Sequence, residues 1–287
     1  MRFGLHALGI GTGARPEIIR AVAEAAEESG FATLWAGEHV VMVDRPESWY
    51  PYSDDGQIAV PADADWLDPL LGLTYAAAAT TRIGLATGIL LLPEHNPVLL
   101  AKQIATLDVL CAGRLTLGIG IGWSAEEFAA LGVPFAGRAR RAREYLTAIR
   151  TLWSEDVASF AGDFVAFDSV RVYPKPVRDR RIPVVVGGNS DPALRRVAAF
   201  GDGWYGFNLS TAEAENRIGA LSGYCREQGR SMADLSIAVA LNDGQPDRLP
   251  ELAAAGVTEL VLLGAPPESE VASGAWVRQL AADWGIR

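Results

Sequence analysis

Glu38 and His39 are neighbouring residues whose side chains could carry out acid–base chemistry. They directly follow an apolar run, 33–37, that is typical of a buried strand. Because imidazole titrates near neutral pH, His39 could donate a proton or hydrogen-bond a ring nitrogen of a ligand. A histidine that caps a loop carbonyl is an equally good interpretation. His6 and His95 stand apart from this pair, and we expect both to be structural.

A glycine interrupts a second apolar run, 82–92, between Thr87 and Ile89. Gly88 at this place indicates a bulge or the close approach of a flat ligand to the backbone. Simple packing is the alternative. If a ligand binds there, Thr87, Gly88 and Ile89 are its expected contacts.

The run 114–120 continues through Gly120 and Gly122 to Trp123. The pattern is not a dinucleotide fingerprint, because a tryptophan stands where the last glycine is needed. A strand end without side chains would instead clear space at the mouth of a barrel. We expect Trp123 to form a wall of that space.

The strongest signal for an anion lies at Gly187, Gly188, Asn189 and Ser190, where an apolar run meets a helical pattern. Backbone N–H groups of a glycine-rich turn and the positive end of a helix dipole favour a phosphate. An ordinary turn, capped by the carboxylate of Asp191, is the alternative. We expect Trp204, in the next run, to face the same ligand.

Eight apolar runs alternate with helical patterns and predict the elements that position these residues. The runs lie at 2–8, 33–37, 82–92, 114–120, 182–188, 202–207, 235–241 and 259–264. Helical patterns lie at 16–29, 97–110, 138–153, 192–200, 212–228, 246–255 and 268–283, and Ser124 with Glu127 predicts a capping box for a short extra helix. This order favours one (β/α)8 barrel domain over 1–287, with insertions after strands two and four. A doubly wound open sheet is the rival.

Composition excludes several functions. The net charge is -10, with 49% hydrophobic residues, so we expect no nucleic-acid partner, and the apolar runs are too short for a membrane span. Three scattered histidines do not support a metal site, and two lysines make Schiff-base catalysis a poor prospect. No export signal opens the chain, and two cysteines fit a reduced cytoplasm.

The sequence resembles the luciferase-like monooxygenase superfamily, and most closely its probable coenzyme F420-dependent oxidoreductases. The resemblance spans nearly the whole chain and includes GFATLWAGEHV, LTLGIGIGW and VVVGGNSDPALRRVAAFGDGWY. It implies a (β/α)8 barrel that binds F420, or alternatively FMN, with a cis peptide at Gly88–Ile89 under the ring. It also implies roles for Glu38 and His39 near the ring and for 187–190 at the phosphate. Trp123 replaces the catalytic glutamate of sugar-phosphate-oxidising relatives, which leaves the proton donor open.

Three functions fit these features. The first is hydride transfer between F420 and a small organic substrate, with His39 moving a proton. The second is an FMN-dependent monooxygenase, and the third is a non-catalytic flavin-binding protein. The aromatic residues of the first insertion would close the site or serve as packing anchors; they are Trp49, Tyr50, Tyr52 and Trp66. We also expect a homodimer.

Overall fold

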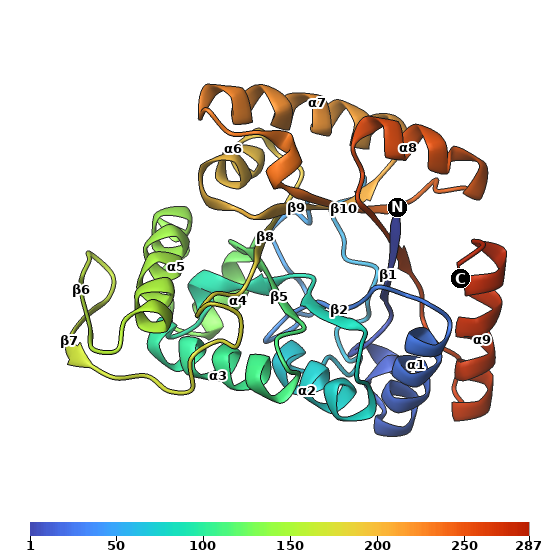
Figure 1. Cartoon of the computed structure of the whole chain (residues 1–287), viewed down its shortest axis with the longest axis horizontal. Helices are drawn as coiled ribbons and strands as arrows, with labels where there is room; N and C mark the ends of the chain where they lie inside the picture. Colours follow the sequence, from blue (N-terminus) through green and yellow to red (C-terminus); the bar gives the residue numbers. More distant parts are fainter. Residues whose placement is uncertain (287) are drawn as a thin grey trace.

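Within residues 1–286, which the computed structural model describes, eight parallel strands close into a barrel (Figure 1). Each barrel strand pairs with the next one along the chain, and the last pairs with the first. They are β1 (Arg2–His6), β2 (Thr33–Ala36), β3 (Gly84–Thr87), β5 (Leu115–Gly120), β8 (Val184–Gly187), β9 (Gly203–Leu209), β10 (Ser236–Leu241) and β11 (Glu259–Leu263). The two-residue β4 (Leu90–Leu91) continues β3 past a break and pairs with β5. The predicted (β/α)8 barrel is confirmed.

Helices surround the barrel (Figure 1). They are α1 (Pro16–Glu28), α2 (Pro69–Ala79), α3 (Pro97–Leu110), α4 (Ala125–Ala130), α5 (Arg138–Ser154), α6 (Asp191–Phe200), α7 (Thr211–Glu227), α8 (Leu249–Ala255) and α9 (Glu270–Asp283). Short 3-10 turns lie at Gly11–Ala14, Leu92–Glu94, Met232–Asp234 and Pro246–Arg248. The last of these shortens the helix expected over 246–255.

Helix α2 is absent from the predicted elements. It begins after Asp68, whose carboxylate accepts a hydrogen bond from the N–H of Leu71 at 2.9 Å. Its sequence, PLLGLTYAAAA, is apolar at nearly every position, so it has no polar face from which a helical period could be recognised.

The two insertions lie in different places. Residues 37–68 follow strand β2, and aromatic side chains from this insertion contact residues at the carboxyl ends of the strands. The second insertion is a hairpin, β6 (Ala158–Ala161) with β7 (Ala166–Val170). It lies between strands β5 and β8 but directly follows helix α5, and it projects beside α5 away from the barrel (Figure 1).

Two hydrophobic layers hold the barrel together. The larger one lies between strands and helices, and a smaller cluster fills the barrel interior. In the interior the rings of Trp35 and Tyr205 stack, with centroids 4.7 Å apart. The indole N–H of Trp35 donates to the buried carboxylate of Glu259 at 2.8 Å. Burial raises the pKa of Glu259.

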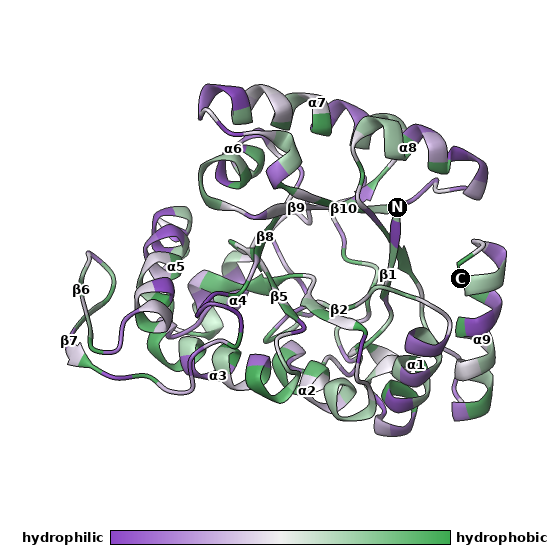
Figure 2. Ribbon diagram, viewed as in Figure 1, coloured by the Kyte–Doolittle hydropathy of each residue, from purple (hydrophilic) through white to green (hydrophobic). Residues whose placement is uncertain are grey.

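Large apolar side chains remain exposed on α2 and α3, which lie next to one another in the lower part of Figure 2. Leu71 is 72% exposed, Leu110 62% and Leu99 58%. Among residues 1–286, no helix has the length and apolarity that a membrane crossing requires.

Candidate active site at the barrel mouth

The carboxyl ends of the parallel strands bring most of the predicted residues to one mouth. The Gly88–Ile89 peptide bond lies between β3 and β4 and is cis, as the resemblance implies. Thr87 does not face this mouth. Its buried hydroxyl donates to the carbonyl of Gly118 at 2.7 Å and accepts from the N–H of Gly118 at 2.8 Å, so it joins β3 to β5.

The side chain of Ile89 occupies the space that two of the glycines leave. A Cβ atom on Gly187 would lie 2.7 Å from the Cδ1 atom of Ile89, and one on Gly120 would overlap the same atom. Ile89 is half-buried and packs on the interior cluster. The space beside Gly120 and Gly187 is therefore taken up by Ile89, which forms the floor of the mouth.

Gly122 and Trp123 behave differently from one another. Gly122 has a φ of 74°, and a Cβ there would lie 2.5 Å from the ring of Phe128 and 2.9 Å from a carboxylate oxygen of Glu94. The lack of a side chain at Gly122 therefore allows Phe128 and Glu94 to pack closely. Trp123 lies beside His39, with ring centroids 5.8 Å apart.

Glu38 does not form a pair with His39. Its buried carboxylate accepts from the N–H of Leu91 at 2.5 Å and lies 3.0 Å from Nε2 of His95. Burial lowers the pKa of His95, but the hydrogen bond and the charge of Glu38 raise it more, so the net shift is upward. The carboxylate of Glu38 therefore binds the backbone of β4 and the imidazole of His95.

His39 pairs with Glu127, a residue 88 positions away. Nδ1 of His39 lies 2.8 Å from Oε2 of Glu127, and the side chains are 8% and 1% exposed. The ring of Trp66 meets the imidazole edge-on, with centroids 4.9 Å apart. Only half of the predicted capping box forms. Ser124 accepts from the N–H of Glu127 at 3.2 Å, but the carboxylate of Glu127 reaches the β2 loop instead.

The predicted phosphate turn presents free donors. Gly188 has a φ of 109°, and no described residue accepts from the backbone N–H groups of Asn189, Ser190 and Asp191. Ser190 is the N-cap of α6, is exposed and makes no capping hydrogen bond, so its hydroxyl is free as well. The amide of Asn189 is not free: it donates to the carbonyl of Phe207 at 2.7 Å and accepts from its N–H at 3.2 Å.

Two neighbours of this turn differ from expectation. The carboxylate of Asp191 does not cap the helix, because it lies 2.7 Å from Nη1 of Arg217. Trp204 is fully buried outside the barrel interior, and its indole N–H donates to the carbonyl of Gly188 at 2.9 Å. Trp204 therefore supports the turn from behind and does not face the ligand.

Three of the four aromatic residues of the first insertion contact the mouth. Tyr50 meets Trp123 edge-on at 5.2 Å between centroids, and Tyr52 meets Phe207 at 5.4 Å. Burial raises the pKa of Tyr52 to about 12. The indole N–H of Trp66 donates to the carbonyl of Gly37 at 3.1 Å. The fourth, Trp49, is 64% exposed and takes no part.

Two further residues near the mouth were not predicted as site residues from the sequence. His6 lies beside Gly37, and its Nδ1 hydrogen-bonds the hydroxyl of Tyr205 at 3.0 Å; burial lowers the pKa of His6 to about 4. Glu94 is 8% exposed, and neither carboxylate oxygen has a hydrogen-bond partner among the described residues. Burial, with the charges of Glu127 and Glu38, raises the pKa of Glu94 to about 9, so Glu94 is protonated at neutral pH.

A family model described as luciferase-like monooxygenase matches residues 1–242. The chain belongs to the luciferase-like monooxygenase family. It is 35% identical over 283 residues to an uncharacterised protein of Mycobacterium tuberculosis, with 98% of each chain covered. It is also 36% identical over 139 residues to the FMNH(2)-dependent dimethylsulfone monooxygenase of Pseudomonas putida, with 47% of this chain and 38% of that protein covered.

Solved structures share the luciferase-like fold at low identity. The coenzyme F420-dependent tetrahydromethanopterin reductase from Methanopyrus kandleri superposes with a TM-score of 0.77 at 18% identity, covering 100% of this chain and 99% of that one. An F420-dependent secondary alcohol dehydrogenase in complex with an F420–acetone adduct superposes with a TM-score of 0.77 at 16% identity, with the same coverage of the two chains.

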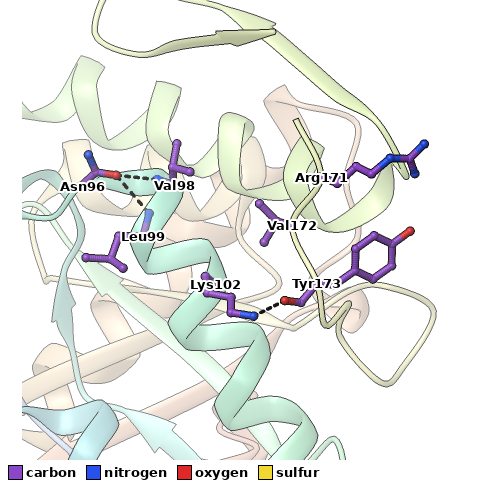
Figure 3. Close-up of a pocket in the computed structure, with 7 residues that line it drawn as sticks. All are labelled: Asn96, Val98, Leu99, Lys102, Arg171, Val172 and Tyr173. Atoms are coloured by element: carbon purple, nitrogen blue, oxygen red, sulfur yellow. Dashed lines mark hydrogen bonds between the residues drawn. The ribbon is translucent and has the colours of Figure 1, made fainter. Parts of the chain in front are cut away.

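The donors of this luciferase-like chain fit a phosphorylated flavin or deazaflavin at the turn. A cavity of about 540 Å³ continues beyond the turn, and its wall includes Tyr52, Asn189, Asn208, Arg217 and Asn242. A second cavity, of about 650 Å³, lies outside the barrel between α3 and the segment after β7 (Figure 3). In it Lys102 reaches the carbonyl of Tyr173. It contains none of the predicted site residues.

Proposed function

We propose that this protein is an oxidoreductase that binds coenzyme F420 at the barrel mouth and transfers hydride between F420 and a small organic substrate. The observation that carries the choice of cofactor is the 540 Å³ cavity beyond the phosphate turn. FMN ends at its phosphate, whereas F420 continues into a polyglutamate tail that needs space there. Carboxamides and Arg217 in the cavity wall can hydrogen-bond such a tail, although Asp54 and Glu213 also line it.

The chain's own residues have defined tasks in this proposal. The free N–H groups of 189–191 and the hydroxyl of Ser190 bind the phosphate, and Ile89 supports the ring from below. Tyr50 and Trp123 exclude water from the mouth. His39 moves the proton that accompanies hydride transfer. When bound, F420 supplies the ring carbon that accepts or donates the hydride.

A titration with each cofactor tests the proposal. We expect F420 fluorescence to be quenched with a dissociation constant at least about tenfold below that of FMN. Arg217→Gln should weaken F420 binding about tenfold. FMN binding should weaken less, because the variant loses only the ion pair that holds the carboxylate of Asp191 away from the turn. Arg195→Gln is the matched control, because Arg195 lies on the neighbouring helix α6 in an exposed ion pair with Glu227. Equal binding of both cofactors, or an equal effect of both substitutions, would contradict the proposal.

The second candidate is an FMN-dependent monooxygenase that uses reduced flavin and oxygen. It is favoured by the 36% identity to the dimethylsulfone monooxygenase over nearly half of this chain. In that case FMN should bind more tightly than F420. Oxygen uptake should then depend on reduced FMN and on a substrate.

We also propose that the protein forms a homodimer through α2 and α3. A helix that is apolar on all sides, such as α2, is normally buried, yet Leu71 is 72% exposed here. A twofold axis would cover this face with the same face of a second copy. Leu71→Asp with Leu110→Asp should give a monomer in analytical ultracentrifugation. The control is Val271→Asp, because Val271 is 82% exposed on α9.

A further inference from the structure

Helix α4 carries two adjacent glutamates that hold different parts of the first insertion. Oε1 of Glu126 accepts from the N–H groups of Glu47 and Ser48, at 2.7 and 3.0 Å. Oε1 of Glu127 accepts from the N–H of Val40 at 2.7 Å. Both carboxylates thus anchor backbone. Only Glu127 also contacts an imidazole, through its second oxygen.

The surroundings of Glu127 decide where the hydrogen of His39 lies. An ionised carboxylate can only accept hydrogen bonds, and Glu127 is 1% exposed, so its oxygens need donors from the protein. Backbone N–H groups donate to Oε1, so the donor to Oε2 is Nδ1 of His39, at 2.8 Å. A neutral imidazole with its hydrogen on Nδ1 has a lone pair on Nε2.

The ring of His39 is also fixed in direction. Trp66 and Trp123 meet the imidazole nearly at right angles, at 84° and 79°. No described residue hydrogen-bonds Nε2 of His39. The ring therefore offers one free nitrogen, in a fixed orientation, between two walls of the mouth.

We propose that Glu127 is the positioning residue for His39. Its carboxylate holds the hydrogen on Nδ1 and so leaves Nε2 as the atom that exchanges a proton at the mouth. The use of that proton in hydride transfer rests on the proposed function, but the tautomer of His39 does not. Glu126, by contrast, contacts no imidazole; it binds backbone N–H groups and the hydroxyl of Ser124.

Nitrogen-15 NMR of the imidazoles, in protein without any cofactor, tests this proposal directly. The chain has three histidines, so three ring systems appear, and His39→Gln identifies the signals of His39 by their loss. At about pH 8.5, we expect the hydrogen of His39 on Nδ1 in the wild-type protein. A hydrogen on Nε2 instead would overturn the proposal without any variant having to fold.

Two matched substitutions sharpen the test. In Glu127→Gln the amide can donate to Nδ1, which should move the ring hydrogen to Nε2 and change the tautomer ratio at least about tenfold. Glu126→Gln should leave the ratio unchanged. If both variants gave the wild-type ratio, Glu127 would not position the ring. The F420 titration is a separate measurement, so failure of the proposed cofactor would not be confused with failure of this inference.

Discussion

The site contains two carboxylate–imidazole pairs, and they serve different purposes. In the pair Glu38–His95, the carboxylate also binds the N–H of Leu91, so the pair ties the end of β2 to the β4 segment. In the pair Glu127–His39, the imidazole stands between two tryptophans with one nitrogen free. Glu38 and His39 are adjacent in sequence, yet each belongs to a different pair. Adjacency along the chain is therefore a poor guide to partnership at a strand end.

The largest expected effect comes from His39→Ala. Hydride transfer should slow by about 10²- to 10⁴-fold, because the mouth loses its positioned proton carrier. The F420 dissociation constant should stay within several-fold, since His39 lies apart from the phosphate turn. Stopped-flow fluorescence of F420, with a substrate found by screening, measures both quantities. His95→Ala is the control. If His95→Ala slowed hydride transfer as much as His39→Ala does, the two pairs would not differ in purpose.

The second effect concerns stability. Glu38→Ala removes the acceptor of Leu91 N–H and the partner of His95, both inside the protein. We expect the free energy of unfolding to fall by about 3 kcal/mol, measured by urea denaturation. The tautomer of His39 should not change in this variant. A change of tautomer would show that the two pairs act as one unit.

The sequence predicted the strands and the glycine-rich turn before α6 because those features depend on local patterns. Apolar runs mark barrel strands, and glycines before a helix mark a turn; the binding of a phosphate at this turn stays a prediction. Which carboxylate pairs with which imidazole at the mouth depends on contacts between distant parts of the chain, and no local pattern reveals these contacts. Glu127 contacts His39 although the two lie 88 residues apart in the sequence. The carboxylate of Glu38 instead binds the N–H of Leu91, shortly after the cis peptide Gly88–Ile89.

Alternation along β9 shows the same limit. Tyr205 lies in the interior cluster and Trp204 in the outer one, but a run that is apolar at consecutive positions does not reveal which side faces inward. The sequence therefore indicated an aromatic pair at this strand and did not reveal which of the two faces the barrel interior.

The third prediction concerns Glu94. Burial raises its pKa, and the charges of Glu127 and Glu38, one from each pair, raise it further. Its pKa lies at about 9 in the folded protein, against an ordinary value of 4.5. Between these values the folded chain binds a proton that the unfolded chain has lost, so stability falls as pH rises. Glu94→Gln stays uncharged in both states and removes this cost. We expect it to be more stable than wild type by at least about 2 kcal/mol at pH 8, and no different at pH 4. Equal urea midpoints at pH 8 would mean that Glu94 is not held protonated.

The smallest expected effect is the pH dependence of the Glu38–His95 pair. The pKa of His95 is raised above its ordinary value of 6.5, because Glu38 outweighs the effect of burial. A histidine with a raised pKa binds its proton more tightly in the folded state. Its contribution is therefore complete below pH 6.5 and is lost as pH rises through the folded pKa.

Comparison with His95→Gln isolates this contribution. The stability difference between wild type and His95→Gln should be largest near pH 6 and should shrink by about 1 kcal/mol at higher pH, in urea denaturation at a series of pH values. A difference that grew with pH would mean that His95 is neutral in the folded protein. The pair would then be an ordinary hydrogen bond and not an ion pair.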